Sequence, residues 1–225
     1  HPIFVFHANG HLATVNTFTL TKCDITKDHT SPGVGRDQFG EPNGELREPA
    51  AMALAKDEFR FITTVVTSPE AFRDFGFAMR NAGITTSTDL GNMFHMTDNS
   101  RASLQEMTSR SDFPIRLVSA SRVMGSVEDA HKIVEQIAAA RNVQHPKLTF
   151  PIVKMVLDGS IQGFTAVIDW PGYFTGEDHA LFLIPPEQVV DLLRPIHQAK
   201  IGIHCHCNGN TTSEVFIDAI DQLVS

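Results

Sequence analysis

The chain has 225 residues, of which 42% are hydrophobic, and this is enough apolar surface to bury the core of one large domain. With 18 Lys and Arg against 26 Asp and Glu, the formal net charge is −8 and no basic stripe is present, so we expect no nucleic-acid partner. No apolar run approaches the roughly 20 residues of a membrane span, so we expect no membrane partner either.

The number of cysteines indicates the cellular compartment, and the first residues indicate whether the sequence is part of a longer protein. Three cysteines do not make a disulfide framework, which favours a reducing compartment, and we predict a cytoplasmic protein. His1 and Pro2 stand where an initiator Met is expected, and they lead directly into an apolar run from Ile3 to Phe6. We therefore expect an internal fragment.

Two segments near the start are rich in polar and turn-forming residues. The histidines of His7-Ala8-Asn9-Gly10-His11 could reach a substrate or cap a turn, and both interpretations stay open. Residues 31–48 contain four Gly, two Pro and an Asp that punctuate short polar stretches. This composition predicts a small, turn-rich β insertion between regular units.

Four apolar strands follow, each succeeded by a helical pattern, and they centre near Ile84, Ile115, Val153 and Ile203. This alternation is typical of βαβ units, in which a crossover helix returns the chain for the next parallel strand. The fold class is therefore α/β over residues 1–225, with the insertion at 31–48.

Capping signals place the first two helices. One begins at Ser68 as N-cap with Pro69 in the first turn, and ends near Gly83. The second begins at Ser126, with Asp129 three residues on, and has an apolar stripe at helical spacing. In the first helix the residues expected to face inward are Phe72, Phe75 and Met79.

Two further helices flank the last strand. One follows Pro185 and Pro186, and Pro195 inside its pattern predicts a bend. The other is expected from about Ser213 to Val224.

The strand from Phe150 to Gly159 places Lys154 and Asp158 on one face. Apolar neighbours lower the pKa of a lysine, and such an amine forms Schiff bases or binds CO₂ as a carbamate. The alternative is an ion pair between Lys154 and Asp158 that only fills the interior.

The strand Ile201 to Cys207 carries the most informative pattern in the chain. His204 and His206 share one face, and the apolar residues, Cys205 and Cys207 share the other. Two imidazoles at the carboxyl end of a parallel strand suit zinc or a similar ion, although two core histidines bonded to the backbone are the plainer interpretation. The cysteines face the helices and are expected to be inert packing.

Five segments together resemble the amidohydrolase superfamily, and within it the metal-dependent hydrolases similar to N-substituted formamide deformylase, some of which are labelled exoenzyme regulatory proteins. No phosphate loop or Gly-x-Ser-x-Gly elbow competes with this resemblance. The segments, in order, are His11-x-x-x-x-Asn16, Gly44-Glu45-Leu46-Arg47-Glu48, Gly83-Ile84-Thr85, Val153 to Ser160 with Thr165-Ala166, and His206-Cys207-Asn208-Gly209.

The resemblance implies a distorted (β/α)8 TIM-type barrel with one or two divalent ions, usually zinc, at the carboxyl ends of its strands. Lys154 would be the fourth-strand lysine, often carboxylated to bridge two metals, and His206 the fifth-strand ligand, with His204 beside it. A metal-activated water would then hydrolyse a non-peptide C–N bond of a small amide-type substrate. Substrate contacts would come from His11, Asp158 and Asn208.

The chain also departs from the family. The His-x-His pair of the first strand, the histidine of the sixth and the aspartate of the eighth lie outside the segments present, which would be about strands 2 to 5. Asn210 stands where the family usually has aspartate. We expect a fragment that is inactive alone, whose open sheet edges a homo-oligomer could cover. The alternatives are a non-catalytic regulatory or assembly module, and a metal-free enzyme that uses Lys154 as a Schiff-base amine.

Overall fold

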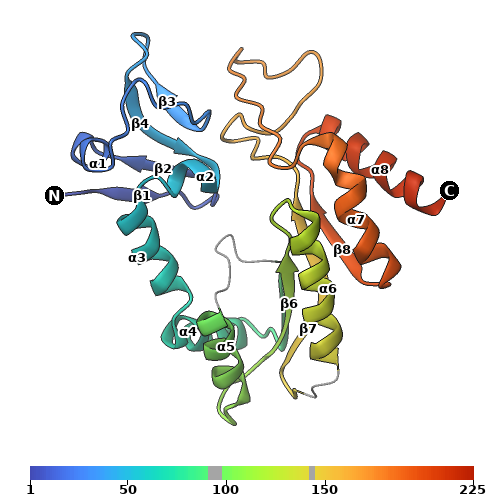
Figure 1. The fold of residues 1–225 in the computed structure, drawn as a ribbon. Coiled ribbons are helices and arrows are strands. Elements are labelled where there is room, and N and C mark those ends of the chain that lie inside the picture. The colour runs from blue at the N-terminus through green and yellow to red at the C-terminus, as the bar shows by residue number, and fades with distance from the viewer. Residues whose placement is uncertain (91–97, 142–144) are drawn as a thin grey trace.

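The computed structural model describes residues 1–90, 98–141 and 145–225, and of 98–100 only the backbone. The described residues form two four-stranded sheets, one antiparallel and one parallel, and helices connect them (Figure 1). Among the described residues, none of the helices combines the length and the apolar character that a bilayer crossing requires.

The antiparallel sheet contains the first quarter of the chain. Its strands are β1 (Phe4–Phe6), β2 (Leu12–Val15), β3 (Val34–Arg36) and β4 (Pro42–Arg47), in the order β1-β2-β4-β3. The helices α1 (Thr17–Lys22) and α2 (Glu48–Met52) pack on it around a core that includes Ala13, Leu46 and Met52.

Residues 31–48 are therefore rich in β structure, but they do not form a separate insertion. Strand β4 pairs with β2, with Ala13 opposite Leu46, so β3 and β4 complete one sheet with residues 4–15. The reason is that Leu46 and Val34 bury their side chains in the same core as β2.

Two helices, α3 (Lys56–Val66) and α4 (Pro69–Asn81), lead from this sheet to the parallel one. Helix α5 (Asp98–Ser109) comes after β5 (Thr86–Asp89), the first strand of the parallel sheet, and leads to the second strand. The side chain of Ser68 accepts a hydrogen bond from the N–H of Ala71, as its role of N-cap predicts. Phe72 and Met79 pack into a small core with Phe113 and Leu117, but the prediction for Phe75 is wrong, since it is 40% exposed.

The four predicted strands form one parallel, curled sheet. They are β5 (Thr86–Asp89), β6 (Arg116–Arg122), β7 (Leu148–Val156) and β8 (Gly202–His206), in sequence order across the sheet. The first begins two residues after Ile84, which is itself exposed. The arrangement is that of a partial TIM-like barrel.

Three helices cover the outer face of this sheet (Figure 1). They are α6 (Val127–Arg141), α7 (Val189–Gln198, after a 3-10 turn at Pro186–Gln188) and α8 (Asn210–Val224). The side chain of Ser126 accepts from the N–H of Asp129, as its capping role predicts. Helix α7 continues through Pro195, and α8 begins three residues before the predicted Ser213.

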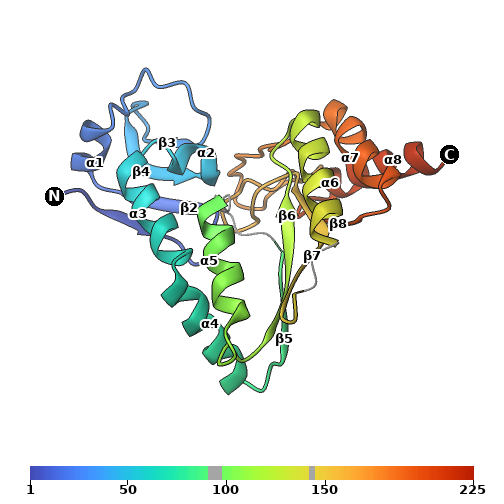
Figure 2. The same cartoon turned by 60° about the horizontal axis from the view of Figure 1, so that its bottom comes forward.

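The alternation expected in β7 and β8 is confirmed. Val153 and Met155 are fully buried in the core under the outer helices, and Ile203, Cys205 and Cys207 pack against the same core. Side chains at the alternating positions therefore face the inner side of the curled sheet. Residues 157–185 run from the end of β7 to α7 as turns and loops, and Figure 2 shows them between the end of the parallel sheet and the antiparallel sheet.

Candidate active site

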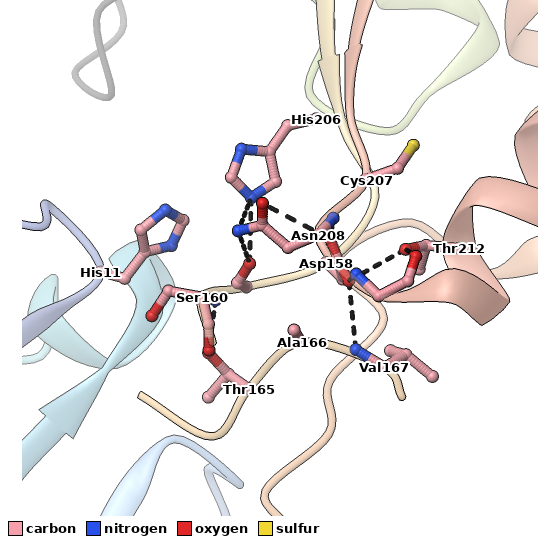
Figure 3. Close-up of polar contacts among 12 residues, drawn as sticks. His11, Asp158, Ser160, Thr165, Ala166, Val167, His206, Cys207, Asn208 and Thr212 are labelled. Atoms are coloured by element: carbon pink, nitrogen blue, oxygen red, sulfur yellow. Dashed lines mark hydrogen bonds and ion pairs between the residues drawn. The ribbon is translucent and has the colours of Figure 1, made fainter. Parts of the chain in front are cut away.

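The carboxylate of Asp158 organises the carboxyl ends of β7 and β8. Asp158 is fully buried, and its Oδ1 accepts from the N–H of Asn208 at 2.9 Å. Its Oδ2 accepts from the N–H of Gly209 at 2.7 Å, from the Thr212 hydroxyl at 2.9 Å and from the N–H of Val167 at 3.1 Å. Four donors thus compensate one buried carboxylate, and they fix where α8 begins (Figure 3).

The described part of the chain contains no ion pair between Asp158 and Lys154, the alternative that the sequence left open. What the structure gives Asp158 is a positioning role for the β8–α8 turn. A substrate contact of Asp158 stays a prediction.

His206 lies at the end of β8 with one ring nitrogen held. Its Nε2 is 2.9 Å from the carbonyl oxygen of Gly159, and the Asn208 amide nitrogen is 2.9 Å from both atoms. The Gly159 carbonyl oxygen can only accept, and its two lone pairs can accept from both nitrogens. The neutral His206 ring therefore carries its proton on Nε2, which donates to this carbonyl. Nδ1 is then unprotonated, and no described residue bonds it.

Burial lowers the pKa of His206, and its interactions with His11 and Lys154 lower it further, against the raising effects of its hydrogen bond to Gly159 and of Asp158. The neutral imidazole is the form that binds a metal ion. His206 therefore has the protonation state and the free nitrogen that a ligand needs.

Lys154 forms one rung of the inner face with residues of the adjacent strands. Arg122 on β6 and His204 on β8 are its direct neighbours in the parallel register. Burial lowers the pKa of the Lys154 amine, and the Arg122 guanidinium also lowers it, while Cys205 and Cys207 oppose the shift. No acceptor among the described residues takes a hydrogen bond from this amine, which favours its neutral form.

Lys154 and His206 belong to this inner face together. In the parallel register Lys154 is opposite His204 and Val156 is opposite His206, so Lys154 and His206 are diagonal neighbours on adjacent strands. The effect of Lys154 in lowering the pKa of His206 is consistent with this proximity. His204 is exposed, and among the described residues it forms no hydrogen bond or ion pair with Lys154 or His206.

The antiparallel sheet contributes a second histidine to this place. His11 comes from the turn between β1 and β2, and its Nδ1 is 2.9 Å from Oε2 of Glu48. Its ring centroid lies 5.2 Å from that of His206, and Figure 3 shows the two rings side by side. The turn residue of the sequence interpretation is thus brought to the predicted site.

Glu48 is the residue that sequence reasoning missed. It is fully buried, its Oε1 accepts from the Thr165 hydroxyl at 2.8 Å, and its N–H donates to the carbonyl of His11. Gly159 passes directly beside it, and a Cβ there would overlap Oε1 of Glu48 and the Thr165 hydroxyl. The motif Gly44 to Glu48 was the available signal, but nothing in its spacing indicates a partner 37 residues earlier.

The donor set around the inner face suits a divalent ion in part. Two imidazoles and a lysine that can become a carbamate are nitrogen and oxygen donors of the kind zinc accepts. However, among the described residues no group of three or more His, Cys, Asp and Glu side chains is placed to hold an ion. Lys154, as a carbamate, or further residues would have to complete the set of metal ligands.

Comparison with known proteins agrees with the architecture. The structure is similar to an uncharacterized metal-dependent hydrolase from Pyrococcus horikoshii OT3, with a TM-score of 0.60 and 14% identity over 98% of this chain and 42% of that one. It is also similar to an uncharacterized metal-dependent hydrolase from Pyrococcus furiosus, with a TM-score of 0.59 and 13% identity over 100% of this chain and 44% of that one. At these identities the similarity shows the fold.

The chain spans less than half the length of these solved structures. No curated protein matches it significantly. The model of the amidohydrolase family matches residues 1–225, the whole chain, and the protein belongs to the amidohydrolase family.

Proposed function

We propose that the protein containing this chain is a metal-dependent hydrolase of a non-peptide, amide-type C–N bond, and that Lys154 and His206 hold its divalent ion, most simply zinc. The observation that carries the proposal is their placement. A half-buried amine with a lowered pKa and a neutral imidazole with a free nitrogen share the inner face where two parallel strands end. Enzymes built on such barrels place their chemistry at this end of the sheet.

Lys154 has the environment that carbamate formation requires. The reaction joins the neutral amine nitrogen to the carbon of CO₂, and the nitrogen loses one proton, so the product is an anionic carbamate. Burial and Arg122 favour the neutral amine that starts the reaction, and the same guanidinium can then face the new negative charge. This converts an uncommon ligand, lysine, into an oxygen donor.

The other residues keep the site in place. Asp158 fixes the turn after β8, Gly159 orients His206 through its carbonyl, and Asn208 donates to the same carbonyl. A bound divalent ion would supply a water of lowered pKa and a polarised substrate carbonyl. Asn208 is exposed at the carboxyl end of β8, and we propose that its side chain also contacts the substrate.

A panel of N-substituted amides, with and without added zinc, tests this function in the full-length protein. We expect hydrolysis that a chelator abolishes and zinc restores. Lys154→Ala should abolish the activity, and formate, acetate or propionate should restore part of it by taking the place of the carbamate. Wild-type activity in Lys154→Ala would remove the carbamate from the mechanism.

Two outcomes would favour the rival functions. If borohydride and a carbonyl substrate together give a stable adduct on Lys154, the residue is a Schiff-base amine, because only an imine is reduced in this way. If neither metal-dependent turnover nor adduct formation is found, a regulatory or assembly role of this fold remains the better interpretation.

A further inference from the structure

His11 and His206 show the same arrangement although they come from different sheets. Each ring has one nitrogen fixed by an acceptor of the chain: Nδ1 of His11 by the Glu48 carboxylate, and Nε2 of His206 by the Gly159 carbonyl. The opposite nitrogen of each ring bonds no residue that the structure describes, and it is free to bind a metal ion when the ring is neutral with its proton on the fixed nitrogen. Histidines that bind a metal almost always donate their other N–H to a carboxylate or a backbone carbonyl.

The spacing of the two rings is suitable for one shared ion. Two imidazoles on a tetrahedral zinc, with bonds of about 2.0–2.1 Å, have ring centroids roughly 5 Å apart. The centroids of His11 and His206 are 5.2 Å apart, with a tilt of 35° between the rings. Figure 3 shows both rings beside the end of strand β8.

Three features of the position of Glu48 are each unfavourable in free energy. Its carboxylate is fully buried, its backbone has a φ of 65°, and the chain beside it must be glycine at position 159. Non-glycine residues rarely adopt this backbone conformation, and such strain persists where the surrounding structure requires it, often at functional sites. This arrangement secures two contacts of the carboxylate, Oε1 with the Thr165 hydroxyl and Oε2 with Nδ1 of His11.

We propose that Nε2 of His11 is a ligand of the same divalent-cation site as His206, and that Glu48 is the positioning residue that keeps the His11 proton on Nδ1. This inference rests on the proposed function, since it concerns the ion expected there. It adds a ligand from the antiparallel sheet, so the site would join the two sheets of the molecule.

Titration of the metal-free full-length protein with Co²⁺ tests the assignment, with dissociation constant and visible absorption as readouts. We expect His11→Asn to weaken Co²⁺ binding at least tenfold and to alter the absorption bands, as His206→Asn does. Glu48→Gln, which keeps an oxygen acceptor for Nδ1–H, should weaken binding less than Glu48→Ala. His131→Asn, on the exposed side of α6, is the matched control and should bind as the wild type.

The outcomes separate the two proposals. If His206→Asn loses Co²⁺ but His11→Asn binds with wild-type affinity and spectrum, the role of His11 is overturned and the proposed function stands. If the wild type binds no Co²⁺, both fail. If Glu48→Ala and Glu48→Gln bind equally to the wild type while His11→Asn does not, Glu48 has no positioning role. Thermal unfolding of each variant identifies any that do not fold, and His11→Asn, which alters no core residue, then decides the ligand assignment.

Discussion

The carboxylate of Asp158 accepts the N–H of Gly209 at 2.7 Å, and this hydrogen bond joins the end of β7 to the first turn of α8. A Cβ at Gly209 would overlap the carbonyl of Val167, so the turn also packs directly on the backbone of the 157–185 segment. The site therefore depends on a buried polar network around Asp158, and His206 lies beside this network, with its Nε2 4.0 Å from Oδ1 of Asp158.

Asp158→Asn should destabilise the protein by about 2 kcal/mol. The new NH₂ group replaces an acceptor, so at least one buried donor among the four loses its partner. Chemical denaturation measures the change in the free energy of unfolding. Asp191→Asn is the matched control, because the Asp191 side chain on α7 is 67% exposed. Equal stability of the two variants would contradict the organising role of Asp158.

Gly209→Ala should cost about 3 kcal/mol, because the added methyl group meets backbone of Val167 that cannot move without the whole segment. Its φ of −80° is ordinary, so the loss would report the close approach alone. Gly202→Ala, whose Cβ would be 3.3 Å from a methyl group of Ile152, should change the free energy of unfolding by no more than about 0.5 kcal/mol. A folded Gly209→Ala with the wild-type melting temperature would show that the turn is not tightly packed.

Much of the parallel sheet could be predicted from the sequence. Period-two alternation identified the faces of β7 and β8, and Ser68 and Ser126 marked two helix starts, because these signals are local. The pairing of Glu48 with His11 could not be predicted, since it depends on how β4 pairs with β2. Phe75 shows the limit of periodicity: its spacing is helical, but no part of the described chain covers that side of α4.

Lys154→Met should raise the melting temperature by about 2 °C or more while it abolishes activity. The folded pKa of Lys154 lies below its unfolded value near 10.4, so the unfolded state binds more protons between the two values and the wild type is penalised below that range. The advantage of Met should be present at pH 7 and fade as the pH approaches about 10.4. Lys132→Met, on the exposed side of α6, is the matched control for the change from Lys to Met. A lower melting temperature at pH 7 would indicate that the Lys154 amine is stabilising.

His206→Gln should change how stability responds to acid. The folded pKa of His206 lies below about 6.5, its unfolded value, so the wild type loses stability as the pH falls through 6.5 toward the folded pKa. The variant lacks this loss, so its free energy of unfolding should rise relative to that of the wild type as the pH falls from 7.5 to 5. Denaturation at several pH values measures the difference. His131→Gln, at an exposed position of α6, is the matched control for the change from His to Gln. A His206→Gln curve parallel to that of the wild type would contradict the neutral, buried imidazole.

The central claim is that Lys154 and His206 hold a divalent ion, and metal analysis of the purified full-length protein tests it most directly. We predict about one or two equivalents of a zinc-like ion per chain in the wild type, and a clear loss in a Lys154→Ala, His206→Asn double variant that still folds. A wild type without bound metal after purification and zinc addition, or a double variant with the full wild-type content, would contradict the account.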